Sequence, residues 1–228
     1  MREKQQARLN RLFRRARIPK RAQHVRLRHF REMGHEAALA AAHDLVAHGD
    51  VVTEGGETFC GLHLHGPTGV GKTWLAAAVA NEFLTRGVPV LFIKVPALLD
   101  HLRETFHPAS EVTFDALFSE VLNVPVLILD DLGAQQTTSW MAEKLFQLVD
   151  WREAEQLITV VTSNLDRAAL LAQFEALDDW QGRRVISRLY TMTFEAPMGG
   201  ADRRLVSVAT TSTHWASRRG AVQNHREA

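Results

Sequence analysis

The sequence reads Gly66-Pro67-Thr68-Gly69-Val70-Gly71-Lys72-Thr73 between an apolar run and an alanine-rich run. Glycines at this spacing let a loop turn its backbone N–H groups inward around phosphate oxygens, and a helix that begins at the loop attracts the anion with its dipole. The stretch is a full match to the phosphate-binding loop (P-loop, or Walker A motif). We therefore expect ATP and Mg²⁺ here, with Lys72 at the β- and γ-phosphates and the Thr73 hydroxyl on the metal.

Helix and strand signals alternate around this loop. Apolar, β-branched runs predict strands over residues 59–65, 88–95, 124–129, 156–162, 190–195 and 205–208. Amphipathic or alanine-rich stretches predict helices over residues 72–86, 96–105, 114–121, 140–153, 167–174 and 182–189. Because fully apolar strands that alternate with helices indicate a parallel sheet covered on both faces, we expect a doubly wound α/β fold.

Polar side chains follow two of the predicted strands. Asp130 and Asp131 come directly after residues 126–129, at the strand end where P-loop enzymes carry the acid that organises the metal. We expect Asp130 in the magnesium shell and Asp131 as the group that polarises the attacking water. Asn164 follows the next strand and is predicted to orient that water beside the γ-phosphate, although Ser-Asn after a strand is also ordinary turn chemistry.

Two arginines share one face of a predicted helix. Arg184 and Arg188 lie four residues apart within residues 182–189. An arginine delivered to the γ-phosphate of a neighbouring subunit stabilises charge in the transition state and couples hydrolysis to assembly. Both residues are therefore candidates for this role, and a solvated basic helix face is the alternative.

Charge is divided unevenly along the chain. Residues 1–31 contain 12 Lys or Arg and one acid, a net charge of +11, whereas the remaining 197 residues have a net charge of −10. Such asymmetry predicts a basic arm that meets nucleic acid or an acidic protein surface. We expect this arm to be helical over residues 2–17 and 20–49, with a solvated basic helix of no particular role as the alternative.

Length and composition bound the class of protein. The 228 residues, 46% of them hydrophobic, suffice for one medium domain with short appendages. We expect a basic helical N-terminal arm (1–50), an ATPase domain (51–208) and a mobile C-terminal tail (209–228). A single cysteine, Cys60, excludes a disulfide within the chain. Because no run of about 18 apolar residues exists and the basic N-terminus lacks a signal-like apolar stretch, we expect a cytoplasmic protein with no membrane association.

Together, these motifs resemble the AAA+ ATPases of the bacterial helicase-loader group, DnaC and DnaI, and the related transposition helper IstB. The matching segments are residues 66–73, Asp130-Asp131-Leu132-Gly133, Thr162-Ser163-Asn164, Arg184-Val185-Ile186-Ser187-Arg188-Leu189, and Arg17-Ile18-Pro19 with Phe30. The resemblance implies a P-loop NTPase fold of AAA+ type in which Lys72, Asp130 and Asp131 run ATP hydrolysis. It further implies that Asn164 is sensor 1 and Arg188 the trans-acting arginine finger. Asp131 stands where many AAA+ proteins have Glu.

The likeness to DnaC extends to residues that would contact DNA. Residues 102–106 resemble its single-stranded-DNA-binding insertion, and Phe106 falls where that family places a base-contacting aromatic. Thr138 and Trp140 fall near positions where DnaC has a hydroxyl and an aromatic that touch DNA. Aromatic faces stack on unpaired bases regardless of sequence. The alternative is that Phe106 and Trp140 are core or helix-packing residues.

The resemblance implies a DnaC-like ATPase that binds single-stranded DNA and helps load a replicative DNA helicase. ATP would lie between the subunits of an ATP-dependent homo-oligomer. The alternatives are an IstB-like helper of a transposase, a small-molecule P-loop kinase, and a nucleotide-gated adaptor that hardly hydrolyses ATP. Helicase loaders carry a helicase-binding N-terminal domain, so we expect that module to be shortened, replaced by the basic arm or supplied by another protein. Arg203 or Arg204 is a candidate second sensor.

Overall fold

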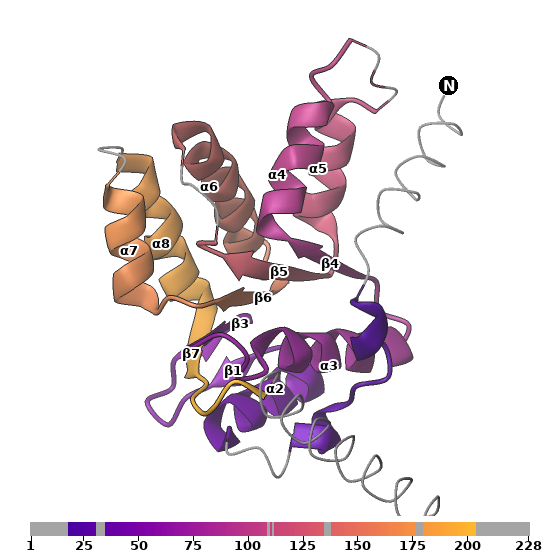
Figure 1. Cartoon of the computed structure of the whole chain (residues 1–228), viewed down its shortest axis with the longest axis vertical. Helices are drawn as coiled ribbons and strands as arrows, with labels where there is room; N and C mark the ends of the chain where they lie inside the picture. The colour runs from indigo at the N-terminus through magenta and orange to yellow at the C-terminus, as the bar shows by residue number, and fades with distance from the viewer. Residues whose placement is uncertain are drawn as a thin grey trace, which may run out of the picture.

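A five-stranded parallel sheet forms the centre of the molecule (Figure 1). The computed structural model describes residues 18–30, 35–108, 110, 112–134, 138–176 and 180–203. The strands are β3 (Gly61–His65), β4 (Val90–Lys94), β5 (Val126–Leu132), β6 (Ile158–Ser163) and β7 (Thr193–Pro197). They lie in the order β4-β5-β6-β3-β7, and each neighbouring pair is parallel. The predicted parallel sheet is thus confirmed.

Helices cover both faces of this sheet (Figure 1). On one face lie α2 (Glu36–His48) and α3 (Lys72–Thr85), and we call it the α3 face. On the other face, here called the α6 face, lie α4 (Val95–Glu104), α5 (Phe114–Asn123), α6 (Ser139–Ala154), α7 (Arg167–Glu175) and α8 (Trp180–Met192). A short hairpin, β1 (Val51–Val52) and β2 (Thr58–Phe59), precedes β3. This is the doubly wound α/β arrangement that the sequence predicts.

Each central strand contributes side chains to two separate hydrophobic cores. On β5, Val126 and Ile128 belong to the core of the α3 face, whereas Leu127 and Leu129 belong to the core of the α6 face. All four side chains are at most 1% exposed. A strand that is buried on both faces has no need of polar residues at alternate positions, which explains the continuous apolar run in the sequence.

The N-terminal part of the described chain packs into the core of the α3 face. It forms two 3-10 helices, η1 (Lys20–Ala22) and η2 (Leu27–Phe30), before α2. The sequence predicts a single helical stretch over residues 20–49, and the structure corrects this. The carbonyls of Ala22 and Val25 accept hydrogen bonds from Nδ2 of Asn81, each at 2.9 Å. Because these carbonyls bond to a side chain of α3, they are not used for the bonds of a continuous α-helix.

A second correction concerns the end of α8. The sequence predicts a strand over residues 190–195, but α8 continues to Met192 and β7 begins at Thr193. The Tyr190 ring lies 4.7 Å from the guanidinium carbon of Arg167, so a tertiary contact keeps it helical against its strand propensity. The predicted helix over residues 2–17, the strand over 205–208 and the tail over 209–228 lie outside the described residues. Within the described part of the chain, no helix is both long and apolar enough to cross a membrane.

Candidate active site

The phosphate loop joins the carboxyl end of β3 to the N-terminus of α3. Gly71 caps α3, so the positive end of the helix dipole faces the loop. Gly69 and Gly71 adopt positive φ angles of 82° and 113°, which side chains strongly disfavour. A Cβ atom at Gly69 would also lie only 1.9 Å from an Asp202 carboxylate oxygen. The positive φ angles therefore favour glycine at both positions, and the close approach of the backbone after β7 requires it at Gly66, where a Cβ atom would lie 2.0 Å from the Met198 carbonyl oxygen.

Lys72 links the phosphate loop to the end of β6. Its side chain is 7% exposed, and its Nζ atom donates to the carbonyls of Gly66 at 2.6 Å and Pro67 at 2.7 Å. It also donates to Oδ1 of Asn164 at 2.8 Å, across 92 residues of sequence. The structure thus brings Asn164 to the loop, because the carboxyl ends of neighbouring parallel strands meet at one edge of the sheet. Phosphate oxygens would replace these carbonyl acceptors when a nucleotide binds.

Asp130 lies beside Thr73, the residue that follows Lys72. Its Oδ1 atom accepts from the hydroxyls of Thr73 at 2.8 Å and Thr162 at 2.7 Å. Its Oδ2 atom is buried and has no hydrogen-bond partner among the described residues. Burial raises the pKa of the Asp130 carboxyl, and the hydroxyls of Thr162 and Thr73 oppose that rise. A hydroxyl beside a carboxylate with a free oxygen is a donor set that fits Mg²⁺.

Asp131 follows Asp130 at a point where the pairing of β5 with β6 is irregular. The register of β5 against β6 shifts between Leu129 and Leu132, and Asp131 has a φ of 61°. Its backbone N–H donates to the Thr162 hydroxyl at 3.0 Å, and its half-exposed carboxylate pairs with Lys94 Nζ at 2.6 Å. The role of Asp131 in activating water stays a prediction. Thr162 contacts both aspartates. The sequence predicts no role for it, although it is the first residue of the segment Thr162-Ser163-Asn164 that resembles the helicase-loader group.

The chain that follows β7 crosses the phosphate loop. The backbone N–H of Met198 donates to the carbonyl of His65 at 2.8 Å, and that of Arg203 donates to the carbonyl of Gly69 at 3.2 Å. Arg203, a predicted candidate for a second sensor, is therefore anchored beside the loop, and Arg204 lies outside the described residues. The approach of Asp202 to Gly69 could not be predicted, because no local pattern in the sequence connects the two residues.

Arg188 lies at the opposite edge of the sheet from the phosphate loop. It is near the end of α8, and the carbonyl of Met192 in the last turn accepts from Sγ of Cys60 at 3.7 Å. Cys60 directly precedes β3, whereas the loop follows β3. Five residues of strand span about 16 Å. Arg188 and Lys72 of one chain are thus separated by the length of the sheet.

Arg184 lies one turn before Arg188 and has aromatic neighbours. Its guanidinium carbon is 3.9 Å from the centre of the Phe146 ring and 4.7 Å from that of the Trp180 ring. Such stacking is a common arrangement for arginine, worth roughly 0.5–2 kcal/mol. The described contacts of Arg184 are therefore those of a residue that packs α8 against α6, and its catalytic role stays a prediction.

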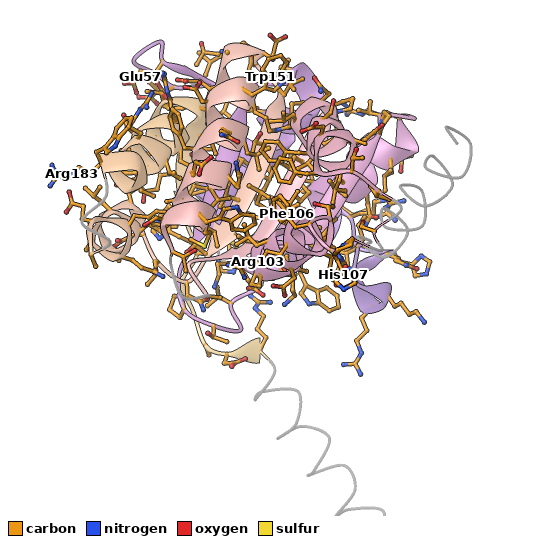
Figure 2. All side chains as sticks on the ribbon, turned by 90° about the horizontal axis from the view of Figure 1, so that it is seen from above. Glu57, Arg103, Phe106, His107, Trp151 and Arg183 are labelled. Carbon is orange, nitrogen blue, oxygen red and sulfur yellow. The ribbon has the colours of Figure 1, made fainter. Side chains whose placement is uncertain are left out.

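The predicted DNA-contacting residues lie around one partly exposed cluster. We call Arg103, Phe106, Phe114 and Trp140 the aromatic surface. Phe106 is 61% exposed, and its ring centre lies 5.5 Å from that of Phe114 and 6.4 Å from that of Trp140. The Arg103 guanidinium carbon lies 4.9 Å from the centre of the Trp140 ring. Figure 2 shows Arg103 and His107 just below Phe106 near the middle of the view, with Trp151 of α6 close to its upper edge.

Thr138 is the third predicted DNA-contacting residue. It forms the N-cap of α6, where its hydroxyl accepts from the backbone N–H of Met141 at 3.3 Å. Threonine is a favoured cap because it satisfies one of the free N–H groups at a helix start. Thr138 thus has a structural role directly beside Trp140, and its contact with DNA stays a prediction.

Curated relatives of this chain are bacterial replication proteins. The chain is 30% identical over 150 residues to the replicative helicase loader DnaI of Bacillus subtilis (strain 168), a match that covers 63% of this chain and 47% of that relative. It is 31% identical over 124 residues to the replicative helicase loader DnaC of Escherichia coli (strain K12), covering 54% and 47%. The chain thus spans about half the length of the curated relatives it matches.

Solved structures are similar in fold. A crystal structure of DnaI aligns with a TM-score of 0.64 at 30% identity, covering 79% of this chain and 94% of that one. A crystal structure of the DnaC helicase loader aligns with a TM-score of 0.61 at 26% identity, covering 79% and 100%. AMPPCP-bound DnaA from Aquifex aeolicus, at 18% identity and a TM-score of 0.61, shares the fold alone. The predicted AAA+ P-loop fold is thus confirmed.

A family model agrees with these likenesses. The model described as IstB-like ATP binding protein matches residues 3–191. That range contains the phosphate loop, both aspartates at the end of β5, Asn164 and Arg188. It also contains the aromatic surface. The chain therefore belongs to the family of IstB-like ATP-binding proteins, in the AAA+ group that includes the DnaI and DnaC helicase loaders.

Proposed function

We propose that this protein is a DnaC-like ATPase that binds single-stranded DNA and helps load a replicative helicase. The observation that carries the ATPase part is the bond network at the carboxyl edge of the sheet. Lys72 contacts Asn164 there, and Thr73 contacts Asp130, so four groups from the start of α3, the end of β5 and the residue after β6 converge at the phosphate loop. The helicase part rests on the likeness to DnaI and DnaC, of whose length the chain spans about half.

Each residue of this network would have a defined task. Lys72 would donate to the β- and γ-phosphates after leaving the loop carbonyls, and Asn164, released from Lys72, would orient the attacking water. Thr73 and Asp130 would hold Mg²⁺, which supplies positive charge between phosphate oxygens when bound. Asp131 would draw a proton from the water once its carboxylate parts from Lys94.

Assembly would complete the site. Arg188 is separated from its own phosphate loop by the length of β3, so it fits a role at the γ-phosphate of a neighbouring subunit. Its side chain is 42% exposed and therefore accessible to a second copy of the chain. An arginine supplied in trans to a transferring phosphoryl group is worth about 10³–10⁵ in rate. Hydrolysis would then depend on an ATP-dependent homo-oligomer.

The aromatic surface supports binding of unpaired nucleic acid. Phe106 exposes a flat ring, and Arg103 and Lys144 lie over neighbouring rings, so stacking surface and positive charge occur together. Stacking of a base on an aromatic ring contributes roughly 1–3 kcal/mol without regard to sequence. This combination favours single strands, whose base faces are free, over duplex DNA.

ATP turnover of the purified protein, with and without a single-stranded oligonucleotide, tests the proposal. We expect DNA to stimulate turnover, Lys72→Ala to abolish it, and Arg188→Ala to abolish it while ATP binding persists. Turnover that ignores both DNA and Arg188 would contradict the loader function. A phosphorylated small-molecule acceptor and a monomeric enzyme would then support the P-loop kinase alternative.

A second candidate is an ATPase helper of a transposase, and the IstB-like family match favours it. Competition between single-stranded and duplex oligonucleotides separates the two candidates. Preference for single strands that is lost in Phe106→Ala supports the loader. Tight, ATP-dependent binding of duplex DNA that is unaffected by Phe106→Ala supports the helper.

A further inference from the structure

Two carboxylates hold the guanidinium group of Arg188. Asp150 Oδ1 lies 2.9 Å from Nε, and Glu153 Oε2 lies 2.7 Å from Nη1. Both acids belong to the last turns of α6. Within the part of the chain that the structure describes, Nη2 contacts no acceptor. The two carboxylates therefore use two of the five N–H donors of the guanidinium, and three donors, two of them on Nη2, remain for an anion from outside.

The two acids differ in how firmly they are fixed. Glu153 uses both carboxylate oxygens, because Oε1 accepts from the Thr191 hydroxyl while Oε2 contacts Arg188. Its side chain is 19% exposed, against 42% for Asp150, which has one described partner. An exposed ion pair contributes about 0–1 kcal/mol, whereas a carboxylate with both oxygens engaged has a defined orientation. Glu153 is thus the stronger constraint on Arg188.

Thr191 connects this carboxylate to the backbone that carries Arg188. Its Oγ1 atom can donate its single proton either to Glu153 Oε1 or to the carbonyl of Arg188, which lies 3.0 Å away and one turn earlier on α8. When the proton goes to Glu153, the carboxylate is tied at one oxygen to α8 and at the other to the Arg188 side chain. This limits the rotamers of Arg188, whose side chain carries about 2 kcal/mol of rotamer entropy.

We propose that Glu153, oriented by Thr191, is a positioning residue that presents Arg188 to the γ-phosphate bound by a neighbouring copy of this chain. The inference rests on the proposed shared active site. A pre-oriented donor costs no reorganisation at the moment of reaction. Contacts that orient metal ligands are worth about 10–100-fold in activity, and we expect the support of Arg188 to lie at the lower end of that range. Glu153 would act through Arg188 alone.

Steady-state turnover of matched variants tests the role of Glu153. We expect Glu153→Ala to lower kcat about tenfold with the KM for ATP unchanged, because the phosphate loop lies at the other edge of the sheet. Asp150→Ala should lower kcat less than about twofold. Thr191→Val should lower kcat and Thr191→Ser should restore it. An equal loss in Asp150→Ala, or no recovery in Thr191→Ser, would show that surface charge or packing is the cause and would overturn the inference.

Mixed oligomers separate this inference from the proposed function. In an equimolar mixture, Glu153→Ala subunits keep an intact phosphate loop, and Lys72→Ala subunits keep an intact Arg188 with its support. We expect turnover per Glu153→Ala subunit to be higher in this mixture than in Glu153→Ala alone. A mixture of Arg188→Ala with Lys72→Ala should likewise exceed Arg188→Ala alone. Recovery of the Arg188→Ala mixture alone would refute the role of Glu153 and leave the shared site standing. No recovery in either mixture would refute the shared site itself.

Discussion

The two faces of the sheet are built from different side chains. On the α3 face, Ala76, Ala77, Ala78 and Ala80 are all fully buried, so small residues let α3 lie close against its neighbours. The α6 face is filled by larger residues and includes the fully buried Arg152. It also presents the aromatic surface and Arg188 to the outside. The comparison indicates that the α3 face provides a rigid support for the phosphate loop, whereas the residues that we propose to meet DNA and a neighbouring subunit lie on the α6 face.

On the α6 face, we expect the largest loss of stability from replacing Arg152. Its guanidinium donates to the carbonyls of Leu122, Val124 and Ile158 and to the Thr159 hydroxyl, at 2.7–2.9 Å. Burial lowers its pKa, and these acceptors offset the loss of water around the charge. We expect Arg152→Met to lower the free energy of unfolding by about 4 kcal/mol, because the acceptors lose their donor.

Urea unfolding followed by circular dichroism measures this change. Arg183 on α8 is a matched control, since its side chain is 71% exposed and pairs with Glu175 at the surface. Arg183→Met should change the free energy of unfolding by less than about 1 kcal/mol. Similar decreases in the free energy of unfolding for both variants would mean that the buried hydrogen bonds of Arg152 do not stabilise the α6 face.

The close packing of the α3 face predicts the next largest effect. Ala78→Leu adds three carbons where no space exists and should lower the free energy of unfolding by about 2–3 kcal/mol. Ala154→Leu, at the exposed end of α6, should change it by less than about 0.5 kcal/mol. Thermal denaturation of both variants tests the difference, and an unaffected Ala78→Leu would contradict the picture of a rigid support.

The aromatic surface predicts an effect of about tenfold on DNA binding. Phe106→Ala removes an exposed stacking ring and should weaken binding of a single-stranded oligonucleotide about tenfold in the presence of ATP. Leu84, 47% exposed on α3, is the matched control on the other face, and Leu84→Ala should leave the affinity unchanged. Fluorescence anisotropy measures both, and equal losses would remove the distinction between the faces.

The smallest predicted effect is a pH dependence that originates at His63. Burial, followed by the charges of His65 and Arg167, lowers the pKa of His63 from 6.5 to about 3. Below about pH 6.5, His63 is protonated in the unfolded chain but stays neutral in the folded chain. Acidification therefore favours the unfolded chain and lowers the free energy of unfolding. We expect the free energy of unfolding to fall by about 1 kcal/mol from about pH 7.5 to about pH 5.5 through this residue.

Chemical denaturation of wild type and His63→Leu at both pH values isolates this contribution. The variant should show a smaller decrease in stability on acidification, even where its stability at neutral pH differs. A decrease of the same size in both proteins would assign the pH dependence to other groups.

Much of the fold could be predicted because its signals are local. The strands β4, β5 and β6 contain continuous apolar or β-branched runs, and their order along the chain with intervening helices indicates a parallel sheet. The prediction holds over α2 and failed over residues 20–30 and 190–192, where the distant side chains Asn81 and Arg167 contact these segments. No window of sequence contains both partners of such a contact.

The site divides in the same way. Asn164 could be expected near Lys72 because both follow neighbouring strands and carboxyl ends of parallel strands share one edge. The contacts of Asp131 with Lys94, of Asp202 with Gly69 and of Arg188 with the end of α6 could not be expected. They depend on a register shift, on the path of the chain after β7 and on the packing of two helices, none of which leaves a periodic pattern.

The side chain of Asn81 has a mechanical consequence. α3 begins at the phosphate loop, and Asn81, nine residues later, ties the carbonyls of Ala22 and Val25 to the same helix. An α-helix of this length is a stiff rod of about 14 Å between the two points. We therefore expect any shift of the loop on nucleotide exchange to move the segment ahead of α2 as well. The basic residues that precede Ile18 continue directly from this segment along the chain, so they would move with it.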